Sequence, residues 1–214
     1  MRKIISATVF LLFSMCTFAV SVKDAWRNMP ATLVPHLDAS KRVSMLDQYE
    51  SGLDEGVQNG LEGESRIEVV MADYMRVSVS RRSVFELKLL DTVTAENTTD
   101  TVICISQTYM GECPESKLSL YTRDWQLISD TIFTSRALLV KPDTMSTHCF
   151  EELLTQIPLV LWRVSLASGR SEAMLSPSLP FTAIEDKEKF APILLQRSLK
   201  WDEKPLKNIK TEEK

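Results

Sequence analysis

Histidine and cysteine, the residues most used for acid–base, nucleophilic and metal chemistry, are scarce in this sequence. The 214 residues contain two histidines, His36 and His148, and four cysteines. Cys149 directly follows His148, but neighbouring helical residues point about 100° apart, so adjacency does not form a thiolate–imidazole pair. His36 has no ligand-type residues at metal-binding spacing nearby. The pattern therefore predicts no catalytic residue, no metal site and no cofactor.

Paired carboxylates are a second possible source of acid–base chemistry. Asp54 with Glu55, and Glu62 with Glu64, lie in polar segments interrupted by glycine, which is typical of solvated loops. The sequence has no G-x-S-x-G serine motif and no glycine-rich phosphate- or dinucleotide-binding motif. Folding can still assemble two carboxylates from distant strands, so a secreted hydrolase is the alternative to a non-catalytic protein.

The four tryptophans are candidates for a binding surface. Trp26, Trp162 and Trp201 each lie beside an apolar run, which favours a place in the core. Trp125 follows Arg123 and Asp124 at a polar turn. We therefore predict that Trp125 is a surface binding residue.

The first residues have the pattern of a secretory signal peptide. Arg2 and Lys3 precede an apolar run of about ten residues, and small residues stand at Ala19 and Ser21. We predict that residues 1–21 are the signal peptide and that cleavage follows Ser21; cleavage after Ala19 is the alternative. The apolar run is shorter than the roughly 20 residues of a membrane-spanning helix, which disfavours an uncleaved anchor.

Export limits what the cysteines can do. Cys16 lies in the predicted signal peptide, and Met15 before it is not the small residue that a lipidation motif requires. Cys104, Cys113 and Cys149 remain, an odd number that does not suit a disulfide-stapled scaffold. A Cys104–Cys113 bridge across a hairpin is the alternative to buried free thiols, which we favour.

Composition and net charge limit the classes of partner that we expect. Removing 21 of 214 residues leaves 193, and losing the two basic residues of the signal peptide changes the net charge from −4 to −6. The 44% hydrophobic and 25% charged residues are those of a globular domain. An acidic chain lacks the basic surface that binds nucleic acid, and no second apolar segment reaches transmembrane length. We expect the mature chain in the periplasm or outside the cell.

Apolar spacing predicts the elements of the N-terminal half. A helix is predicted from about Ala39 to Ser51, packing through Val43, Leu46 and Tyr49 and turning Arg42 to water. Period-two alternation then begins near Arg66. It predicts one hairpin over 74–80 and 85–89 and another over 101–109 and 116–121, with the polar stretch 91–100 as a loop. Each hairpin has one apolar face, so the sheet is predicted to bury one face.

The C-terminal half is predicted to add a helix, a hairpin, a short helix and a last strand. The mid-chain helix carries Phe150, Leu153, Leu154 and Ile157 on one face and stops at Pro158. The hairpin follows over 159–166 and 172–179, the short helix after Thr182, and the strand within 194–201.

This order lacks alternating βαβ units, so the predicted fold class is α+β. We expect an antiparallel sheet built from consecutive hairpins and covered by an N-terminal helix and a mid-chain helix. Residues 22–204 are predicted to form one domain, with a second subdomain from about residue 143 as the alternative. Residues 205–214 are predicted to be a charged tail.

Several sequence blocks resemble a known family when taken in order. They include W-R-N-M-P-A-T-L-V-P-H-L, F-E-L-K-L-L and V-I-C-I-S-Q-T-Y-M-G-E-C-P. Between Trp26 and Trp162 the chain resembles a family of secreted proteins of unknown function from gut Bacteroidetes. This resemblance implies an exported bacterial protein with no established activity and no catalytic residue to carry over.

The resemblance also implies a modification. Exported Bacteroidetes proteins can be O-glycosylated where Asp is followed by Ser or Thr and then by an apolar residue. Asp91-Thr92-Val93 and Asp100-Thr101-Val102 fit this pattern, so Thr92 and Thr101 are predicted O-glycosylation positions.

We interpret the chain as an exported, non-catalytic binding or interaction module of the bacterial cell envelope, whose partner is a protein or a glycan. A shallow exposed apolar sheet face would favour this interpretation. A deep pocket with two close, buried carboxylates of raised pKa would favour the hydrolase. A structural protein that assembles through an open sheet edge is the third hypothesis.

Overall fold

The computed structural model describes residues 20–53, 55–93, 99–181, 183 and 186–201. Its helices are α1 (Val22–Asn28), α2 (Ala39–Glu50), α3 (Thr147–Gln156) and α4 (Lys187–Phe190), with 3-10 turns η1 (Arg136–Leu138) and η3 (Ala191–Ile193). The large sheet comprises β1 (Val57–Gln58), β2 (Glu64–Val70), β3 (Tyr74–Ser80), β4 (Ser83–Val93), β5 (Thr99–Tyr109), β6 (Glu115–Tyr121) and β7 (Leu127–Ile132). The small sheet comprises β8 (Leu161–Ser165), β9 (Glu172–Ser178) and β10 (Arg197–Lys200).

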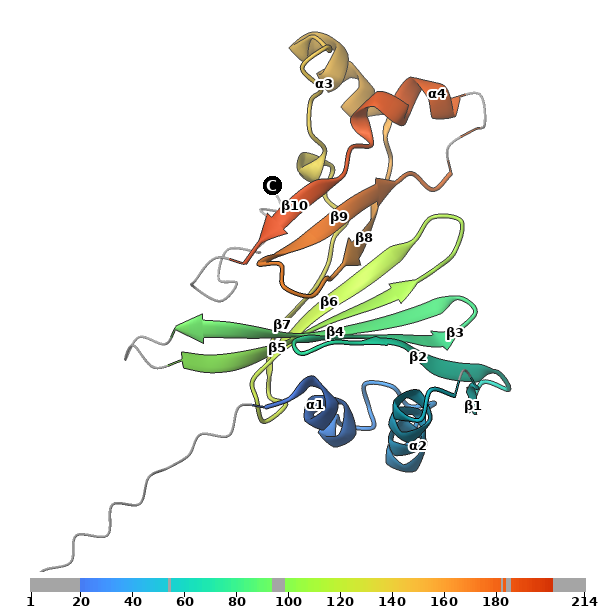
Figure 1. Cartoon of the computed structure of the whole chain (residues 1–214). Coiled ribbons are helices and arrows are strands. Elements are labelled where there is room, and N and C mark those ends of the chain that lie inside the picture. The colour runs from blue at the N-terminus through green and yellow to red at the C-terminus, as the bar shows by residue number, and fades with distance from the viewer. Residues whose placement is uncertain (1–19, 54, 94–98, 182, 184–185, 202–214) are drawn as a thin grey trace, which may run out of the picture.

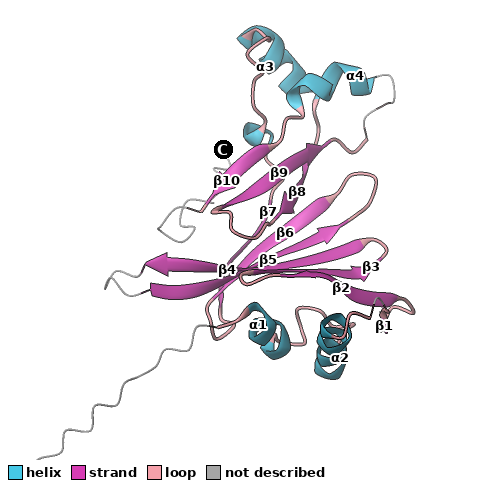
Figure 2. Ribbon diagram, in the orientation of Figure 1, coloured by secondary structure: helices cyan, strands magenta, loops and turns pink. Residues whose placement is uncertain are grey.

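The architecture confirms the predicted α+β class. The large sheet is a seven-stranded antiparallel meander with its strands in chain order, and the small sheet has the order β10-β9-β8. Helices α1 and α2 lie on one face of the large sheet, and the small sheet lies on the other (Figure 1). The secondary structure thus forms three layers, with α3 and α4 beyond the small sheet (Figure 2).

Two hydrophobic cores hold these layers together. The first lies on the helix face of the large sheet, where Trp26 and Leu46 pack with Phe85 and Ile105. The second lies on the opposite face, which we call the junction face, and α3 contributes Leu153 and Ile157 to it. The mid-chain helix therefore belongs to the second core and the N-terminal helices to the first.

Helix α2 forms where predicted but buries a different face. Asp38 caps it by accepting a hydrogen bond from the Lys41 N–H. Arg42 is 2% exposed, whereas Val43 is 40% exposed, so the predicted orientation is wrong. The reason is that the Arg42 guanidinium donates to the carbonyl of Met29 at 2.6 Å and to that of Leu37 at 3.0 Å, which fixes the chain that enters the helix.

The large sheet buries both faces over its central strands, and the prediction of one buried face is wrong. Alternation places Met75, Val77 and Phe85 on the helix face, as expected. Glu86 and Lys88 lie on the junction face and are only 1% and 2% exposed, because the small sheet covers them.

The boundaries of β4 and β5 differ from the prediction. Both strands run past the expected ends of the hairpins, so that Thr92 pairs with Asp100 and Asp91 with Thr101. Every described residue of stretch 91–100 is therefore in a paired strand, while residues 94–98 lie outside the description. No element was predicted over the residues of α1, β1 or β7.

The C-terminal elements agree with the prediction. Helix α3 starts after its cap Ser146, whose side chain accepts from the Cys149 N–H, and the hairpin and last strand follow in order. The short helix α4 begins at Lys187, and its N-cap residue Asp186 makes no side-chain capping hydrogen bond.

Several predictions fall outside the described residues. They concern the signal peptide up to residue 19, including Cys16, together with Asp54, Thr182 and the tail 205–214. Within the described part of the chain, no helix is both long and apolar enough to cross a bilayer.

Candidate functional site

The histidines and cysteines are scattered over the fold. His36 is half-buried in the loop before α2, and its backbone carbonyl accepts a hydrogen bond from the Gly60 N–H. His148 and Cys149 are exposed in the first turn of α3, at the far end of the molecule (Figure 1). Among the described residues, no three His, Cys, Asp or Glu side chains gather into a possible metal site.

Cys104, Cys113 and Cys149, the cysteines within the described residues, are free, as we favoured, but only Cys104 is buried. Cys104 lies in β5 within the second core, where burial raises the pKa of its thiol and keeps it protonated. Cys113 is half-buried and Cys149 is exposed, so the prediction of buried thiols is wrong for both.

The carboxylate pairs that stood out in the sequence lie at the surface. Glu55, Glu62 and Glu64 are all exposed, and Glu64 accepts a hydrogen bond from the amide of Gln58. Glu62 and Glu64 line an open groove beside β1 and β2, Glu55 lies at a small pocket between α2 and β2, and they do not form a buried pair.

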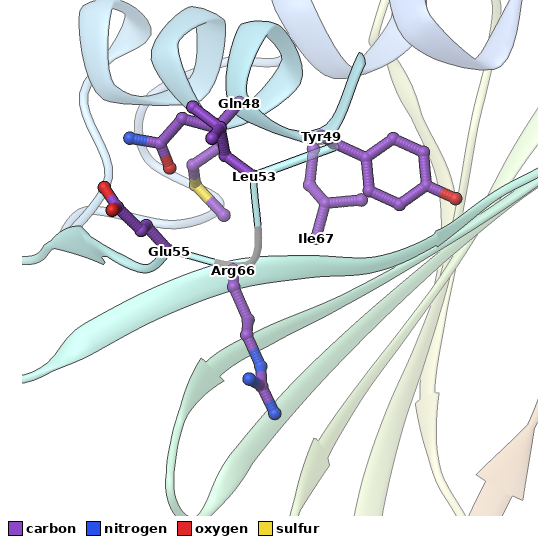
Figure 3. A pocket seen from close by; sticks show the side chains of 7 residues that line it. Gln48, Tyr49, Leu53, Glu55, Arg66 and Ile67 are labelled. Carbon is purple, nitrogen blue, oxygen red and sulfur yellow. The ribbon is translucent and has the colours of Figure 1, made fainter. Parts of the chain in front are cut away.

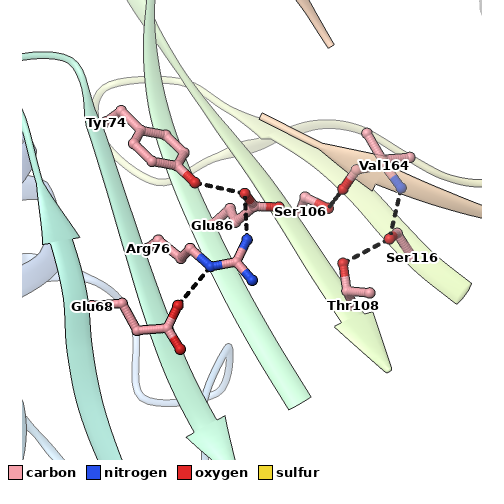
Figure 4. A network of polar contacts seen from close by, with 8 residues as sticks. All are labelled: Glu68, Tyr74, Arg76, Glu86, Ser106, Thr108, Ser116 and Val164. Carbon is pink, nitrogen blue, oxygen red and sulfur yellow. Dashed lines mark hydrogen bonds and ion pairs between the residues drawn. The ribbon is translucent and has the colours of Figure 1, made fainter. Parts of the chain in front are cut away.

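A cluster of buried polar side chains, which was not predicted from the sequence, lies on the junction face (Figure 4). The Tyr74 hydroxyl donates to Glu86 at 2.6 Å, and the Arg76 guanidinium contacts the same carboxylate oxygen at 3.2 Å. Arg76 also bonds Glu68 at 2.6 Å. Burial raises the pKa of Glu86 although Tyr74 and Arg76 favour its charged form, and burial beside Glu86 raises the pKa of Tyr74.

The same face holds the edge strand of the small sheet. The Ser106 hydroxyl donates to the Val164 carbonyl at 2.7 Å, and the Val164 N–H donates to the Ser116 hydroxyl at 2.8 Å (Figure 4). Glu86 accepts a hydrogen bond from the Leu166 N–H. Side chains of the large sheet thus satisfy backbone groups at the edge of β8, which would otherwise be buried without partners.

The contact continues past the end of β8 through Asp73 and Lys88. Lys88 donates to the Ala167 carbonyl at 2.6 Å and pairs with Asp73 at 2.8 Å, while the Ser168 hydroxyl and the Gly169 N–H also donate to Asp73. Partial burial opposes ionisation of Asp73, but these donors prevail and lower its pKa from 3.8 to about 2. The cluster therefore holds the two sheets together. The sequence signal for it was the pair Glu86 and Lys88 within an otherwise apolar strand.

A small pocket separates α2 from β2 (Figure 3). Gln48, Tyr49, Leu53 and Ile67 gather around it, whereas the Arg66 side chain points away. The Gln48 side-chain oxygen is buried there without a hydrogen-bond partner, and the Tyr49 hydroxyl accepts from a backbone N–H of β2. The pocket itself has room for about one water, and the adjoining hollow of about 360 Å³ is open and shallow.

Trp125 occupies a strained turn between β6 and β7. Its φ of 62° lies in the left-handed region, which is rare for a bulky residue. The turn is closed by hydrogen bonds from the Trp125 N–H to the Thr122 carbonyl and from the Thr122 N–H to the Gln126 carbonyl. The indole packs on Tyr121, with ring centroids 5.6 Å apart.

The half-buried Trp125 indole forms one wall of a groove, in agreement with its predicted place at the surface. The groove has a volume of about 430 Å³ and lies between α1 and the β6–β7 turn. Its lining residues are Val20, Asp24, Ala25, Asn28, Arg123, Asp124 and Trp125. The other tryptophans behave as expected, since Trp26 and Trp162 are buried and Trp201 packs against the second core.

Strand β7, which begins two residues after Trp125, is an edge strand with exposed apolar side chains. In the described part of the chain only β6 pairs with it. Leu127, Ile128 and Ile132 are 55%, 41% and 50% exposed. We call these three side chains together with the free backbone edge the β7 edge.

The predicted glycosylation positions lie near the ends of two paired strands. Thr92 belongs to β4 and pairs with Asp100, and Thr101 belongs to β5 and is half-buried. Modification of Thr92 or Thr101 stays a prediction.

Comparison with known proteins identifies a family. The family described as "Protein of unknown function (DUF3256)" matches residues 14–205, and the chain belongs to it. A solved structure of a domain of an uncharacterized protein from Porphyromonas gingivalis W83, an organism of the Bacteroidetes, has a TM-score of 0.63 and 13% identity to this chain. The match covers 85% of this chain and 93% of that one, and at this identity it shows the fold alone. No curated protein matches the chain.

Proposed function

We propose that this member of the DUF3256 family is an exported, non-catalytic binding module of the bacterial cell envelope. Its partner is a protein that adds an extended apolar segment as an eighth strand along the β7 edge. The observation that carries this proposal is the coincidence, on one six-residue strand, of an edge that no described strand pairs with and three exposed apolar side chains.

The free edge favours a peptide over a glycan. One side of β7 has backbone donors and acceptors that no described strand uses, and a second strand matches their spacing directly. A sugar chain offers hydroxyl groups without that repeat. Monomeric proteins usually protect such an edge with lysine or proline, and β7 contains neither.

The charge of the edge favours an apolar, uncharged segment. Asp130 is the one charged residue of β7, and Lys117 of β6 neutralises it at 2.7 Å. A partner strand would therefore meet mainly Leu127, Ile128 and Ile132, whose burial removes apolar surface from water. Beyond one end of the strand, the groove beside Trp125 offers space for a partner side chain.

The buried carboxylate gives the hydrolase hypothesis little support. Glu86 has a raised pKa, which is a feature of many catalytic acids. Its environment is, however, accounted for by the sheet junction, since Tyr74, Arg76 and the Leu166 N–H all bond it beneath β8. Glu86 also lines none of the grooves described above.

Site-specific crosslinking in the native envelope tests the proposal. A photoreactive amino acid at position 132 is expected to crosslink one protein, and mass spectrometry is expected to map the crosslink to an extended apolar segment of it. The same residue at position 43, which is similarly exposed on α2, is the control and should give no such product. A carbohydrate product, a product of two copies of this chain, or equal crosslinking at both positions would overturn the proposal.

A binding measurement then separates the edge from the rest of the surface. A synthetic peptide of the crosslinked segment is expected to bind the purified protein. Ile128→Lys, which adds a charge to the edge, should weaken binding at least tenfold, and Val43→Lys should leave it unchanged. Equal Kd values for the two variants would show that β7 is not the binding site.

A further inference from the structure

The first helix depends on a residue that the predicted signal cleavage would remove. Ser21 is the N-cap of α1, where its hydroxyl oxygen accepts from the Asp24 N–H at 3.1 Å and its O–H donates to the Asp24 carboxylate at 2.6 Å. The Ser21 carbonyl also accepts the first helical hydrogen bond, from the Ala25 N–H at 2.9 Å. Cleavage after Ser21 would delete all three interactions.

The residues on either side of Ser21 are anchored as well. Val22 is 2% exposed in the first core, and half-buried Val20 packs against the same core. Val20 also lines the groove beside Trp125. The folded domain therefore extends to Val20, and cleavage after Ser21 would cut inside it.

The charge of the new N-terminus also favours a chain that begins at Val20 over one that begins at Val22. A chain that begins at Val22 would place its α-ammonium at the first helical position, among N–H groups that already carry partial positive charge. A chain that begins at Val20 places that ammonium two residues away from the helix and keeps the neutral cap. Of the two products, only the chain beginning at Val20 contains the first helix together with its N-cap Ser21.

We propose that the signal peptide is removed between Ala19 and Val20, so that the mature chain begins Val20-Ser21-Val22. Hydrolysis of this bond leaves the Ala19 carboxylate on the signal peptide and the ammonium on Val20, with one water consumed. Ala19 and Thr17 then occupy the last and third-last signal positions, which prefer small residues. The peptidase acts on the unfolded chain, and the structure identifies which product folds into a complete domain.

The position of the new N-terminus gives the cleavage a consequence for binding. With Val20 retained, the groove beside Trp125 keeps this lining residue, and cleavage before Val20 adds an ammonium group to a groove that is also lined by Asp24 and Asp124. This inference rests on the export that we propose above. It does not depend on what binds to β7.

Sequencing of the exported protein tests the cleavage position. The full-length gene is expressed in a bacterial host of the same phylum, and the envelope protein is analysed by N-terminal sequencing and intact mass. An N-terminus of V-S-V-K-D is expected. A V-K-D-A-W start would overturn the proposal in favour of cleavage after Ser21, and an intact Met1 would overturn both the cleavage and the proposed export.

A stability comparison tests the physical reason. Purified chains beginning at Val20 and at Val22 are unfolded in urea, and loss of the cap is expected to lower the folding equilibrium constant at least about fivefold. Ser21→Ala in the longer chain should reproduce much of this loss, while Ser44→Ala, at an exposed position of α2, should not. Equal stability of the two chains would show that Ser21 does not belong to the folded domain.

Discussion

The Val164 N–H of β8 donates to the hydroxyl of Ser116 in β6 at 2.8 Å, across the boundary between the two sheets. Ser116 in turn contacts the Thr108 hydroxyl at 2.7 Å, and Ser106 donates to the Val164 carbonyl. β8 is an edge strand of the small sheet, and no strand of the large sheet pairs with it through backbone hydrogen bonds. Side chains of the large sheet bond its backbone groups instead. This arrangement explains why serines and charged residues are buried in the centre of a large sheet.

Replacing Ser116 tests this explanation. Ser116→Ala leaves the buried Val164 N–H without an acceptor, which is expected to lower the free energy of unfolding by about 1–3 kcal/mol. Urea unfolding at neutral pH measures the change, with Ser198→Ala at an exposed strand position as the control. A loss no larger than that of the control would mean that water replaces the hydroxyl at the junction.

Asp73 is expected to make the junction sensitive to acid. Its pKa is lowered from 3.8 to about 2 in the folded state, so its stabilising effect is present above pH 4 and is lost as the pH falls toward 2. Because the side chain is 32% exposed, we expect about 1–2 kcal/mol from this carboxylate. Asp73→Asn should lower the free energy of unfolding at pH 7 by that amount. It should also reduce the further loss of stability between pH 4 and pH 2. Asp130→Asn removes a surface ion pair and should change stability by less than about 1 kcal/mol.

Glu86 is expected to give the opposite pH dependence of stability to Asp73. Its folded pKa is raised above the ordinary 4.5, so its contribution to stability is fully present below pH 4.5 and declines as the pH rises through the raised pKa. Glu86→Gln keeps an oxygen acceptor but no charge and should remove this decline. Urea unfolding at several pH values from 4.5 to 7.5 should therefore show that the free energy of unfolding of the variant increases relative to that of the wild type as the pH rises. Parallel pH profiles would contradict the raised pKa.

The sequence predicted correctly those elements whose buried residues follow from the spacing of apolar residues within the element itself. Helix α3, with Leu153 and Ile157, and the β3–β4 hairpin are examples. Glu86 and Lys88 were misjudged because their burial depends on β8: Lys88 contacts Ala167, which is 79 residues later in the chain. No local pattern carries that information.

The same limit explains the errors at α2 and β7. Arg42 is buried because distant carbonyls accept its protons, and a charged residue on a helix otherwise predicts a wet face. Ile128 and Ile132 are apolar but exposed, and apolar residues otherwise predict a core. Of the proposed site, the sequence indicated Trp125 from its polar turn but missed the adjacent edge.

Trp125 allows the strain of the turn to be separated from the contacts of the ring. Trp125→Ala removes the packing on Tyr121 but keeps a side chain at a left-handed φ, whereas Trp125→Gly removes both the ring and the steric conflict. Both variants should be less stable than the wild type, and glycine should be more stable than alanine by about 1 kcal/mol. Urea unfolding of the three proteins measures both differences. If alanine equals glycine, the turn carries no backbone strain; if glycine exceeds the wild type, the indole adds no stability to the fold, and its place in the turn must then be explained by what it binds.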